Sequence, residues 1–225
     1  MDGVILVDKL QGWTSHDVVA KVRGVIKSET GQKVKVGHTG TLDPMATGLL
    51  ILVVGSYTKR AGEFSKLDKT YEAEVTLGAV STTADAEGEI TQKSAHRPTE
   101  TEVKAALNKF IGEISQTPPA YSAIKIDGRR AYKAARAGKP LQIEPRQVKI
   151  YEMTDVNYDY PILKFTAKVS SGTYIRSLAE DIGQALGTGA YLSGLRRTQV
   201  GQFNLKNAPK IENITRVEIS QLLQK

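Results

Sequence analysis

One aspartate lies in a segment whose composition favours contact with a ligand. Asp43 precedes Pro44 in residues 37–48, which contain three glycines, and the apolar run 49–54 follows. Glycines allow the backbone to approach a ligand closely, and an apolar strand can anchor such a loop on a sheet. A carboxylate held there could act as a nucleophile or as a base. Asp-Pro is also common turn chemistry, so the residue type alone leaves both interpretations open.

The composition excludes several other kinds of chemistry. The chain has no cysteine and only His16, His38 and His96, so disulfides, thiolate catalysis and cysteine zinc sites are absent. A zinc-dependent base deaminase would need ligands that this sequence lacks. There is also no Walker loop or dinucleotide fingerprint. We therefore expect neither a metal nor a cofactor.

Basic residues exceed acidic ones, 31 to 24, and the pI is near 9.4. Such an excess favours an anionic partner such as nucleic acid. Each basic cluster could be an ordinary solvated surface, but together they would suit phosphate contacts along a folded RNA arm. The clusters are Lys59, Arg60, Lys66 and Lys69; Arg129, Lys133 and Arg136 on one helical stripe; and Arg196 with Arg197.

Hydrophobic periodicity predicts the elements that would position these residues. Strands and helices are mixed without regular βαβ alternation, which predicts an α+β domain on a mostly antiparallel sheet. We expect strands at 4–7, 49–54, 71–77, 121–126, 146–156, 162–170 and 199–205, with a turn at Asp127-Gly128 after the fourth. We expect helices from a Thr14–Asp17 cap through Ile26, at 99–111, before Gly138 and at 174–186.

The length of 225 residues suits one domain over 1–205 and a short tail over 206–225. The tail is too short for a second folded domain, and we expect Ile211 to Leu223 to form one short helix at most. The N-terminus lacks a basic secretory signal, and no apolar run approaches the roughly 18 residues of a membrane span. We expect a cytoplasmic monomer without an obligate protein partner.

Six motifs follow one another along the chain. They are Gly12-Trp13-Thr14-Ser15-His16-Asp17, residues 37–50 around Asp43, Lys69-Thr70-Tyr71-Glu72-Ala73, Thr117-Pro118-Pro119-Ala120-Tyr121-Ser122-Ala123, Ser171-Gly172-Thr173-Tyr174-Ile175-Arg176-Ser177-Leu178-Ala179 and Leu192-Ser193-Gly194-Leu195-Arg196-Arg197-Thr198. In this order they resemble the motifs of the TruB family of pseudouridine synthases, and the similarity extends from about residue 4 to 203.

The resemblance implies a pseudouridine synthase fold and isomerisation of uridine 55 in the T loop of tRNA, with the target base flipped out of its stack. It assigns the catalytic carboxylate to Asp43 and the cation that keeps it ionised to Arg176. It makes Tyr71 the aromatic residue that stacks on the target base. The alternatives are a structural ion pair or a solvated helix residue for Arg176, and core packing for Tyr71.

The resemblance also implies a set of RNA contacts. His38 matches the histidine that fills the space left by the flipped nucleotide, although a loop histidine bonded to backbone is the alternative. Leu195 would pack near the uracil, and core packing is its alternative. Asp85 could contact RNA or simply cap a turn. The other expected substrate contacts are Gly40, Thr41, Lys59, Lys66, Lys69, Arg129, Lys133 and Arg196.

Two other functions stay open at this point. A tRNA-folding chaperone would bind RNA without needing Asp43. The other is the catalytic subunit of a guide-RNA particle like the dyskerin relatives, which the expected lack of a PUA domain disfavours. Both TruB proteins and dyskerin relatives commonly carry a C-terminal RNA-binding PUA domain, which we do not expect here. We therefore expect tRNA binding to be weaker and more salt-sensitive, with catalysis retained.

Overall fold

The computed structural model describes residues 1–126, 128–139, 141–214 and 219–224. The chain divides into two compact units, Met1–Tyr71 with Arg196–Lys225, and Glu72–Leu195. The chain passes from one unit to the other within two strands, β4 (Lys69–Leu77) and β12 (Ala190–Val200). Each unit is described by itself.

In the first unit, β1 (Gly3–Lys9) pairs antiparallel with β3 (Thr47–Val54) over the full length of β1. The short β2 (Val36–His38) also pairs with β3, and the end of β12 runs parallel to the start of β3. β13 (Phe203–Asn204) turns back on β12. The segment with Asp43 therefore connects two strands of one sheet.

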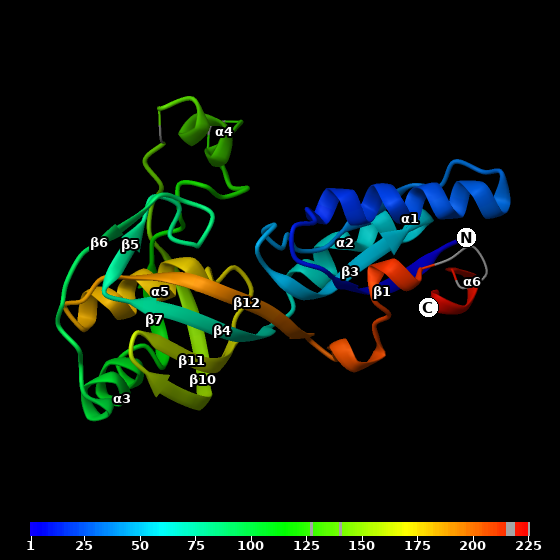
Figure 1. The fold of residues 1–225 in the computed structure, drawn as a ribbon. Helices are drawn as coiled ribbons and strands as arrows, with labels where there is room; N and C mark the ends of the chain where they lie inside the picture. The colour runs from blue at the N-terminus through cyan, green and yellow to red at the C-terminus, as the bar shows by residue number, and fades with distance from the viewer. Residues whose placement is uncertain (127, 140, 215–218, 225) are drawn as a thin grey trace. The chain divides into compact units, whose positions relative to one another are not determined.

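Both faces of this sheet are covered, which explains the unbroken apolar run of β3. Helix α1 (Ser15–Thr30) covers one face, as Figure 1 shows. The other face packs against the 3-10 helix Gly55–Arg60 and α2 (Ala61–Ser65). Toward α1 point Ile5, Val7, Leu50, Leu52 and Val54, and toward the other face point Val4, Leu6, Leu49, Ile51 and Val53.

The C-terminal segment packs on the outer edge of β1. Asp8 N donates to Pro209 O at 2.9 Å, and Val4 N donates to Gln224 O at 2.8 Å. Ile211 is fully buried in the core beneath α1. The segment forms a 3-10 helix at Ile211–Asn213 and α6 at Ile219–Leu222. The rest of the predicted tail helix, 215–218, lies outside the described residues, and the domain boundary at 205 stays a prediction.

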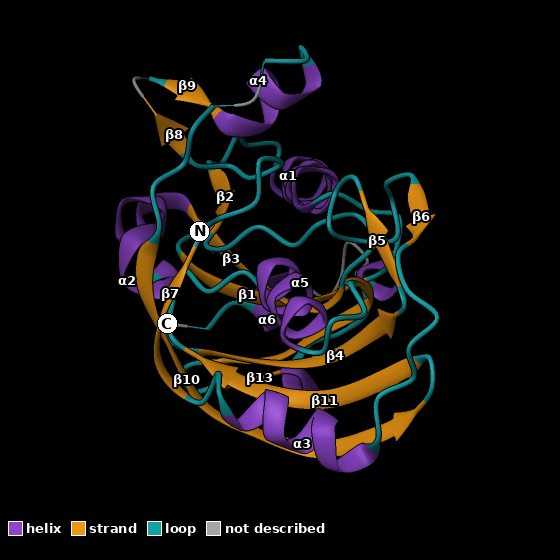
Figure 2. Ribbon diagram, turned by 90° about the vertical axis from the view of Figure 1, so that its left-hand side faces the viewer, coloured by secondary structure: helices purple, strands orange, loops and turns teal. Residues whose placement is uncertain are grey.

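The second unit is built on an antiparallel sheet, in which β4, β11 and β10 lie side by side in Figure 2. The strand order is β12, β4, β11 (Ile162–Val169), β10 (Arg146–Asp159) and β7 (Gly112–Gln116). The helices are α3 (Glu100–Asn108), α4 (Ala131–Arg136) and α5 (Ile175–Ala185). The small sheets are β5 (Ala79–Ser81) with β6 (Ile90–Gln92), and β8 (Lys125–Ile126) with β9 (Arg129–Arg130).

This architecture confirms the predicted α+β class and the mostly antiparallel sheet. Thr14 caps α1 by a capping box with Asp17, as predicted. Strand β12 was missed, because its buried residues include Arg197 and the expected strand was placed at 199–205 instead. The basic stripe was also misplaced, since Arg129 lies in β9 and not in a helix.

The strand predicted at 121–126 is a strand only at its last two residues, and Asp127 of the predicted turn lies outside the described residues. In the described ranges, no helix is long and apolar enough to cross a bilayer. Within the same ranges, no three histidine, aspartate or glutamate side chains are grouped as metal ligands would be.

Candidate active site

The loop that carries Asp43 is fixed to α1 through its backbone. The Ser15 hydroxyl accepts a hydrogen bond from Leu42 N at 2.8 Å and donates one to Leu42 O at 3.1 Å. On the other side of Asp43, Gly12 N donates to Pro44 O at 2.8 Å. Both neighbours of Asp43 are therefore held by the segment 12–15, at the N-terminal end of α1.

Two buried cations also bond to this loop. The fully buried Lys9 ammonium donates to Trp13 O at 2.7 Å, to Leu10 O at 3.0 Å and to Pro44 O at 3.4 Å. The Arg197 guanidinium donates to Gly40 O at 3.0 Å and to Leu49 O at 2.8 Å. Hydrogen bonds to charged donors are stronger than neutral ones, so the loop backbone is firmly constrained.

Within the loop, Asp43 is partly buried, Thr41 is exposed and Leu42 is buried. Asp43 O accepts a hydrogen bond from Ala46 N at 3.1 Å, which closes a turn around Pro44. This turn is the alternative that Asp-Pro chemistry suggested. It keeps the backbone of Asp43 in place and is compatible with a catalytic side chain.

His38 is the last residue of β2 and is partly buried. Its Nδ1 is buried and has no hydrogen-bond partner among the described residues. Burial, the Arg197 charge and then His16 lower the pKa of His38 from its usual 6.5. The imidazole is therefore neutral at pH 7, which suits a side chain that has to contact a nucleobase rather than a phosphate.

Tyr71 and Lys69 lie on the buried side of β4, where every second residue faces inward. The Tyr71 ring is 8% exposed, which suits both core packing and stacking on a base, so its catalytic role stays a prediction. Lys69 is 8% exposed and its ammonium donates to Ser65 O at 2.6 Å. Burial, followed by the Arg197 charge, lowers its pKa to about 8. This environment is unlike that of a phosphate-binding lysine, and its RNA contact stays a prediction.

The other basic residues of the first unit differ in exposure. Lys59 and Lys66 are exposed, as phosphate contacts would be. The Arg196 side chain is 38% exposed, and it forms an ion pair with Asp8 at 2.8 Å and bonds to the Thr47 hydroxyl at 3.3 Å. Arg196 therefore already has a carboxylate partner, and its contact with RNA stays a prediction.

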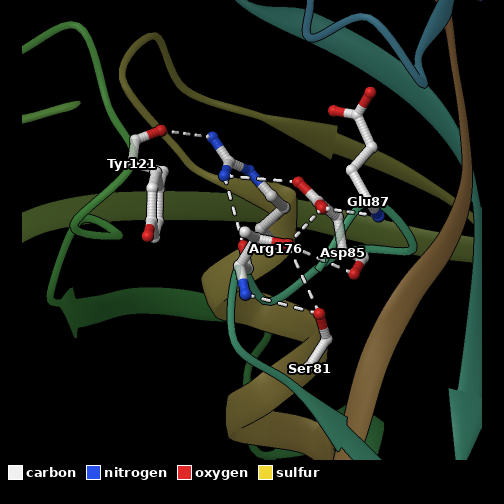
Figure 3. A network of polar contacts seen from close by, with 6 residues as sticks. Ser81, Asp85, Glu87, Tyr121 and Arg176 are labelled. Atoms are coloured by element: carbon white, nitrogen blue, oxygen red, sulfur yellow. Dashed lines mark hydrogen bonds and ion pairs between the residues drawn. The ribbon is translucent and has the colours of Figure 1, made fainter. Parts of the chain in front are cut away.

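In the second unit, Arg176 is the centre of a buried polar network (Figure 3). It lies in the first turn of α5, and its guanidinium forms an ion pair with Asp85 at 3.3 Å. It also donates to Tyr121 O at 2.9 Å and to Thr83 O at 3.3 Å. Three contacts with two separate loops fix the plane and direction of this guanidinium.

Asp85 is 2% exposed, and its carboxylate accepts two hydrogen bonds in addition to its ion pair with Arg176. It accepts from the Thr83 hydroxyl at 2.6 Å and from Glu87 N at 3.0 Å. The bond to the amide two residues ahead is the turn contact proposed as the alternative for this residue. A direct RNA contact by Asp85 stays a prediction, and the structure shows it as the counter-ion of Arg176.

Leu195 is partly buried at the end of the second unit, whereas Arg129 and Lys133 are exposed on β9 and α4. Asp43, His38, Gly40, Thr41 and Arg196 share the first unit with Tyr71 and the three lysines. Arg176, Asp85, Leu195, Arg129 and Lys133 belong to the second. The expected ion pair between Asp43 and Arg176 joins residues of different units and stays a prediction.

Sequence reasoning missed three residues that hold the loop or the network, namely Lys9, Ser15 and Arg197. Ser15 lies within a recognised motif, and its place beside the helix cap was the available signal. Arg197 was read as surface charge, because an arginine pair is far more often solvated than buried. Lys9 gave no signal at all in the sequence.

Comparisons with known proteins place the chain in a class. Residues 27–175 match the model described as TruB family pseudouridylate synthase (N terminal domain), and residues 176–223 match the tRNA pseudouridylate synthase B C-terminal domain. The class is thus that of the pseudouridylate synthases. The chain belongs to the TruB family.

Two relatives and two solved structures illustrate the similarity. A tRNA pseudouridine synthase B of Cupriavidus metallidurans is 48% identical, over 94% of this chain and 67% of the relative. One from Opitutus terrae is 42% identical, over 99% and 90%. A Cbf5-Nop10-Gar1 complex matches with a TM-score of 0.71 and 31% identity over 94% of this chain. An H/ACA RNP bound to a substrate RNA containing 2'-deoxyuridine gives 0.68 and 29%, also over 94%. The chain spans 53% and 51% of the two solved chains.

Proposed function

We propose that this protein isomerises uridine to pseudouridine at position 55 in the T loop of tRNA, with Asp43 as its catalytic carboxylate. The observation that carries the proposal is the loop itself, in which Leu42 and Pro44 are both bonded to the segment 12–15. A reacting group gains most from being held in one geometry before the substrate arrives. The names of the TruB relatives support the choice of tRNA.

The reaction breaks the bond between uracil N1 and ribose C1′ and forms a bond between C5 and C1′. The proton leaves C5, and N1 gains one, so no oxidant, reductant or group donor is consumed. The Asp43 carboxylate could attack the sugar or the base, or remove the C5 proton, and the proposal holds for each of these roles. Tyr71, as the aromatic residue of the motif, would stack on the uracil.

The target base has to leave the stacked T loop, which costs a few kcal/mol. A neutral His38 at the edge of the loop can fill the space that the nucleotide vacates, because an uncharged imidazole stacks without a large desolvation cost. Lys59, Lys66, Arg129 and Lys133 are exposed and suit the phosphates of the arm. We place this activity in the cytoplasm and in a monomer without an obligate partner.

The test is tritium release from tRNA labelled at uridine C5, comparing the unchanged protein with Asp43→Asn. We expect Asp43→Asn to lose at least about 10³-fold in rate while its tRNA affinity stays within a few-fold. Asp155→Asn is the matched control, because Asp155 is exposed and asparagine tolerates its positive φ of 52°. It should react like the unchanged protein.

The same experiment separates the enzyme from a folding chaperone. If neither the unchanged protein nor Asp43→Asn releases tritium, yet both bind and refold tRNA, the chaperone is the correct function. A tRNA with cytidine at position 55 should release nothing, and release from it would move the target to another uridine. Size-exclusion chromatography of the active fraction tests the monomer.

A further inference from the structure

Strand β12 contains two adjacent arginines that differ in solvent exposure. Neighbouring residues of a strand point to opposite faces, and here Arg196 is partly exposed beside Asp8, whereas Arg197 is 2% exposed. The family resemblance assigns no role to Arg197, and the phosphate contact that its charge suggested does not suit a buried side chain. The burial of Arg197 beside the Asp43 loop therefore needs a separate explanation.

The guanidinium of Arg197 bonds to both ends of the Asp43 loop. Its Nη2 donates to Gly40 O at 3.0 Å, three residues before Asp43, and its Nε donates to Leu49 O at 2.8 Å, six residues after it. A planar guanidinium offers donors in two fixed directions and can span two acceptors in this way, whereas an ammonium cannot impose the same geometry. One side chain thus ties together the entry and the exit of the loop.

The backbone of Arg197 meets the same loop directly. Arg197 lies opposite Gly48 in the parallel pairing of β12 and β3. Gly48 has a φ of +100°, and a Cβ atom there would lie 2.3 Å from Arg197 O, so only glycine fits. At Gly40, a Cβ atom would lie 3.4 Å from the guanidinium. The loop and the arginine are therefore packed together without intervening side chains.

The charge of Arg197 has no carboxylate within ion-pair distance in the ranges 1–126, 128–139, 141–214 and 219–224. Burying a cation in that way is costly, and an apolar residue of similar size would avoid the cost. The charge is also felt nearby, since it lowers the pKa of both His38 and Lys69. Both hydrogen bonds of the Arg197 guanidinium go to the Asp43 loop, so the cost of burying this charge is best explained by its effect on that loop.

We propose that Arg197 is a positioning residue, which fixes the loop from Gly40 to Leu49 so that the Asp43 carboxylate is held in its reactive geometry. The inference rests on the proposed function and adds a residue to it. A misplacement of about 1 Å at a reacting group can lower a rate by about 10²-fold. Because Arg197 is buried, its loss changes the catalytic step and leaves RNA binding unaffected.

The experiment compares Arg197→Met and Arg197→Lys with the unchanged protein in the tritium-release assay, with kcat, KM and tRNA Kd measured separately. For Arg197→Met we expect a fall in kcat of about 10²-fold, with KM and Kd within about two-fold. Arg197→Lys keeps the charge but lacks the planar pair of donors that reaches Gly40 O and Leu49 O together, and kcat should be intermediate. Arg23→Met, at an exposed arginine of α1, is the matched control and should match the unchanged protein.

Chemical rescue distinguishes a positioning role from a purely structural one. Arg197→Ala leaves a buried space of guanidinium shape, and millimolar ethylguanidinium should restore at least ten-fold of the lost kcat without changing the Kd for tRNA. Thermal melting gives the folded fraction, and kcat is expressed per folded molecule. If Arg197→Met and Arg197→Ala fail to fold, Arg197→Lys provides the test. A positioning role predicts that this substitution lowers kcat and leaves KM unchanged.

Three outcomes would overturn the inference. One is an unchanged kcat per folded molecule in Arg197→Lys and Arg197→Met. Another is a loss that appears only in KM and Kd, which would make Arg197 a phosphate contact. The third is a lowered kcat that ethylguanidinium leaves unchanged in folded Arg197→Ala. An inactive unchanged protein would instead reject the proposed function itself, so the two failures can be told apart.

Discussion

The two units each contain a buried arginine, and the two guanidinium groups are stabilised in different ways. Arg176 is 5% exposed and has the carboxylate of Asp85 at 3.3 Å, together with two main-chain carbonyls. Arg197 is 2% exposed, and its two acceptors are both main-chain carbonyls. One cation is held by a side chain of opposite charge, and the other by the backbone of a loop.

This difference separates two uses of the same residue type. A counter-ion fixes the position of a charge and reduces its effect on the surroundings, which suits an arginine that has to present a defined charge. Carbonyl acceptors leave the charge largely uncompensated but transmit the position of the arginine to the backbone, which suits the bracing of a loop. The two sites should therefore respond differently when a charge, a contact or the pH is changed.

The largest expected effect is at the counter-ion. Asp85→Asn keeps the size of the side chain but removes the charge beside Arg176, in a place that is 2% exposed. Removing one partner of a buried pair is strongly destabilising, and we expect the free energy of unfolding in urea at pH 7 to fall by about 3 kcal/mol. The exposed Asp155→Asn should change it by less than about 0.5 kcal/mol. A loss below about 1 kcal/mol for Asp85→Asn would mean that the burial of Arg176 does not depend on this carboxylate.

The corresponding test at Arg197 introduces a steric clash between the Asp43 loop and strand β12. Gly48→Ala adds a Cβ atom 2.3 Å from Arg197 O at a φ of +100°, so the strand and the loop have to move apart. We expect a loss of about 2 kcal/mol in the free energy of unfolding and a fall in kcat.

Gly24→Ala is the control for that substitution, because Gly24 lies in α1 with no atom within 4 Å of the added Cβ. It should raise the free energy of unfolding by roughly 0.5 to 1 kcal/mol, through helix propensity alone. If Gly48→Ala were as stable and active as the unchanged protein, the close packing of β12 on the loop would not matter.

A double-mutant cycle sharpens the contrast between the two arginines. Arg176→Met alone leaves the Asp85 carboxylate buried without its cation, whereas Arg176→Met with Asp85→Asn removes both charges. We expect the two substitutions to be non-additive by about 1 to 2 kcal/mol, with the double variant more stable than the sum predicts. The same urea denaturation measures all four proteins. Additive losses would show that Asp85 and Arg176 act independently.

The fold was largely predictable because most of its signals are local. The alternation of residues 71–77, the capping box at Thr14 and the apolar run of β3 each follow from neighbouring residues, and the structure confirms all three. Strand β12 was missed since Gly194 and the arginine pair interrupt its apolar alternation. A buried arginine reads as a surface residue until the strand beside it is known.

Candidate site residues could be named from the sequence where they belong to a motif. Residues that act through a long-range contact could not. The motifs predicted catalytic roles for Asp43 and Arg176, which stay predictions, and the structure shows that Arg176 is buried. The hold of Ser15 on Leu42 and of Arg197 on Gly40 joins residues 27 and 157 positions apart. No local pattern encodes such a contact, because it depends on the way in which the sheet brings the strands together.

The smallest expected effect is a pH dependence at Lys69, which has Arg197 as a neighbouring charge. Its pKa is lowered from 10.5 to about 8 in the folded protein, so between these values the unfolded chain holds a proton that the folded protein has lost. Stability contributed by this group therefore rises with pH from about 8 to 10.5, and the full cost of burying the ammonium is present below pH 8.

In Lys69→Met this cost is absent at every pH. From pH 7.5 to pH 10 the unchanged protein should gain about 2 kcal/mol relative to Lys69→Met, measured by urea denaturation. Lys66→Met, at an exposed lysine three residues earlier, should show a constant difference, and a constant difference for Lys69→Met as well would mean that the ammonium is solvated and does not feel Arg197.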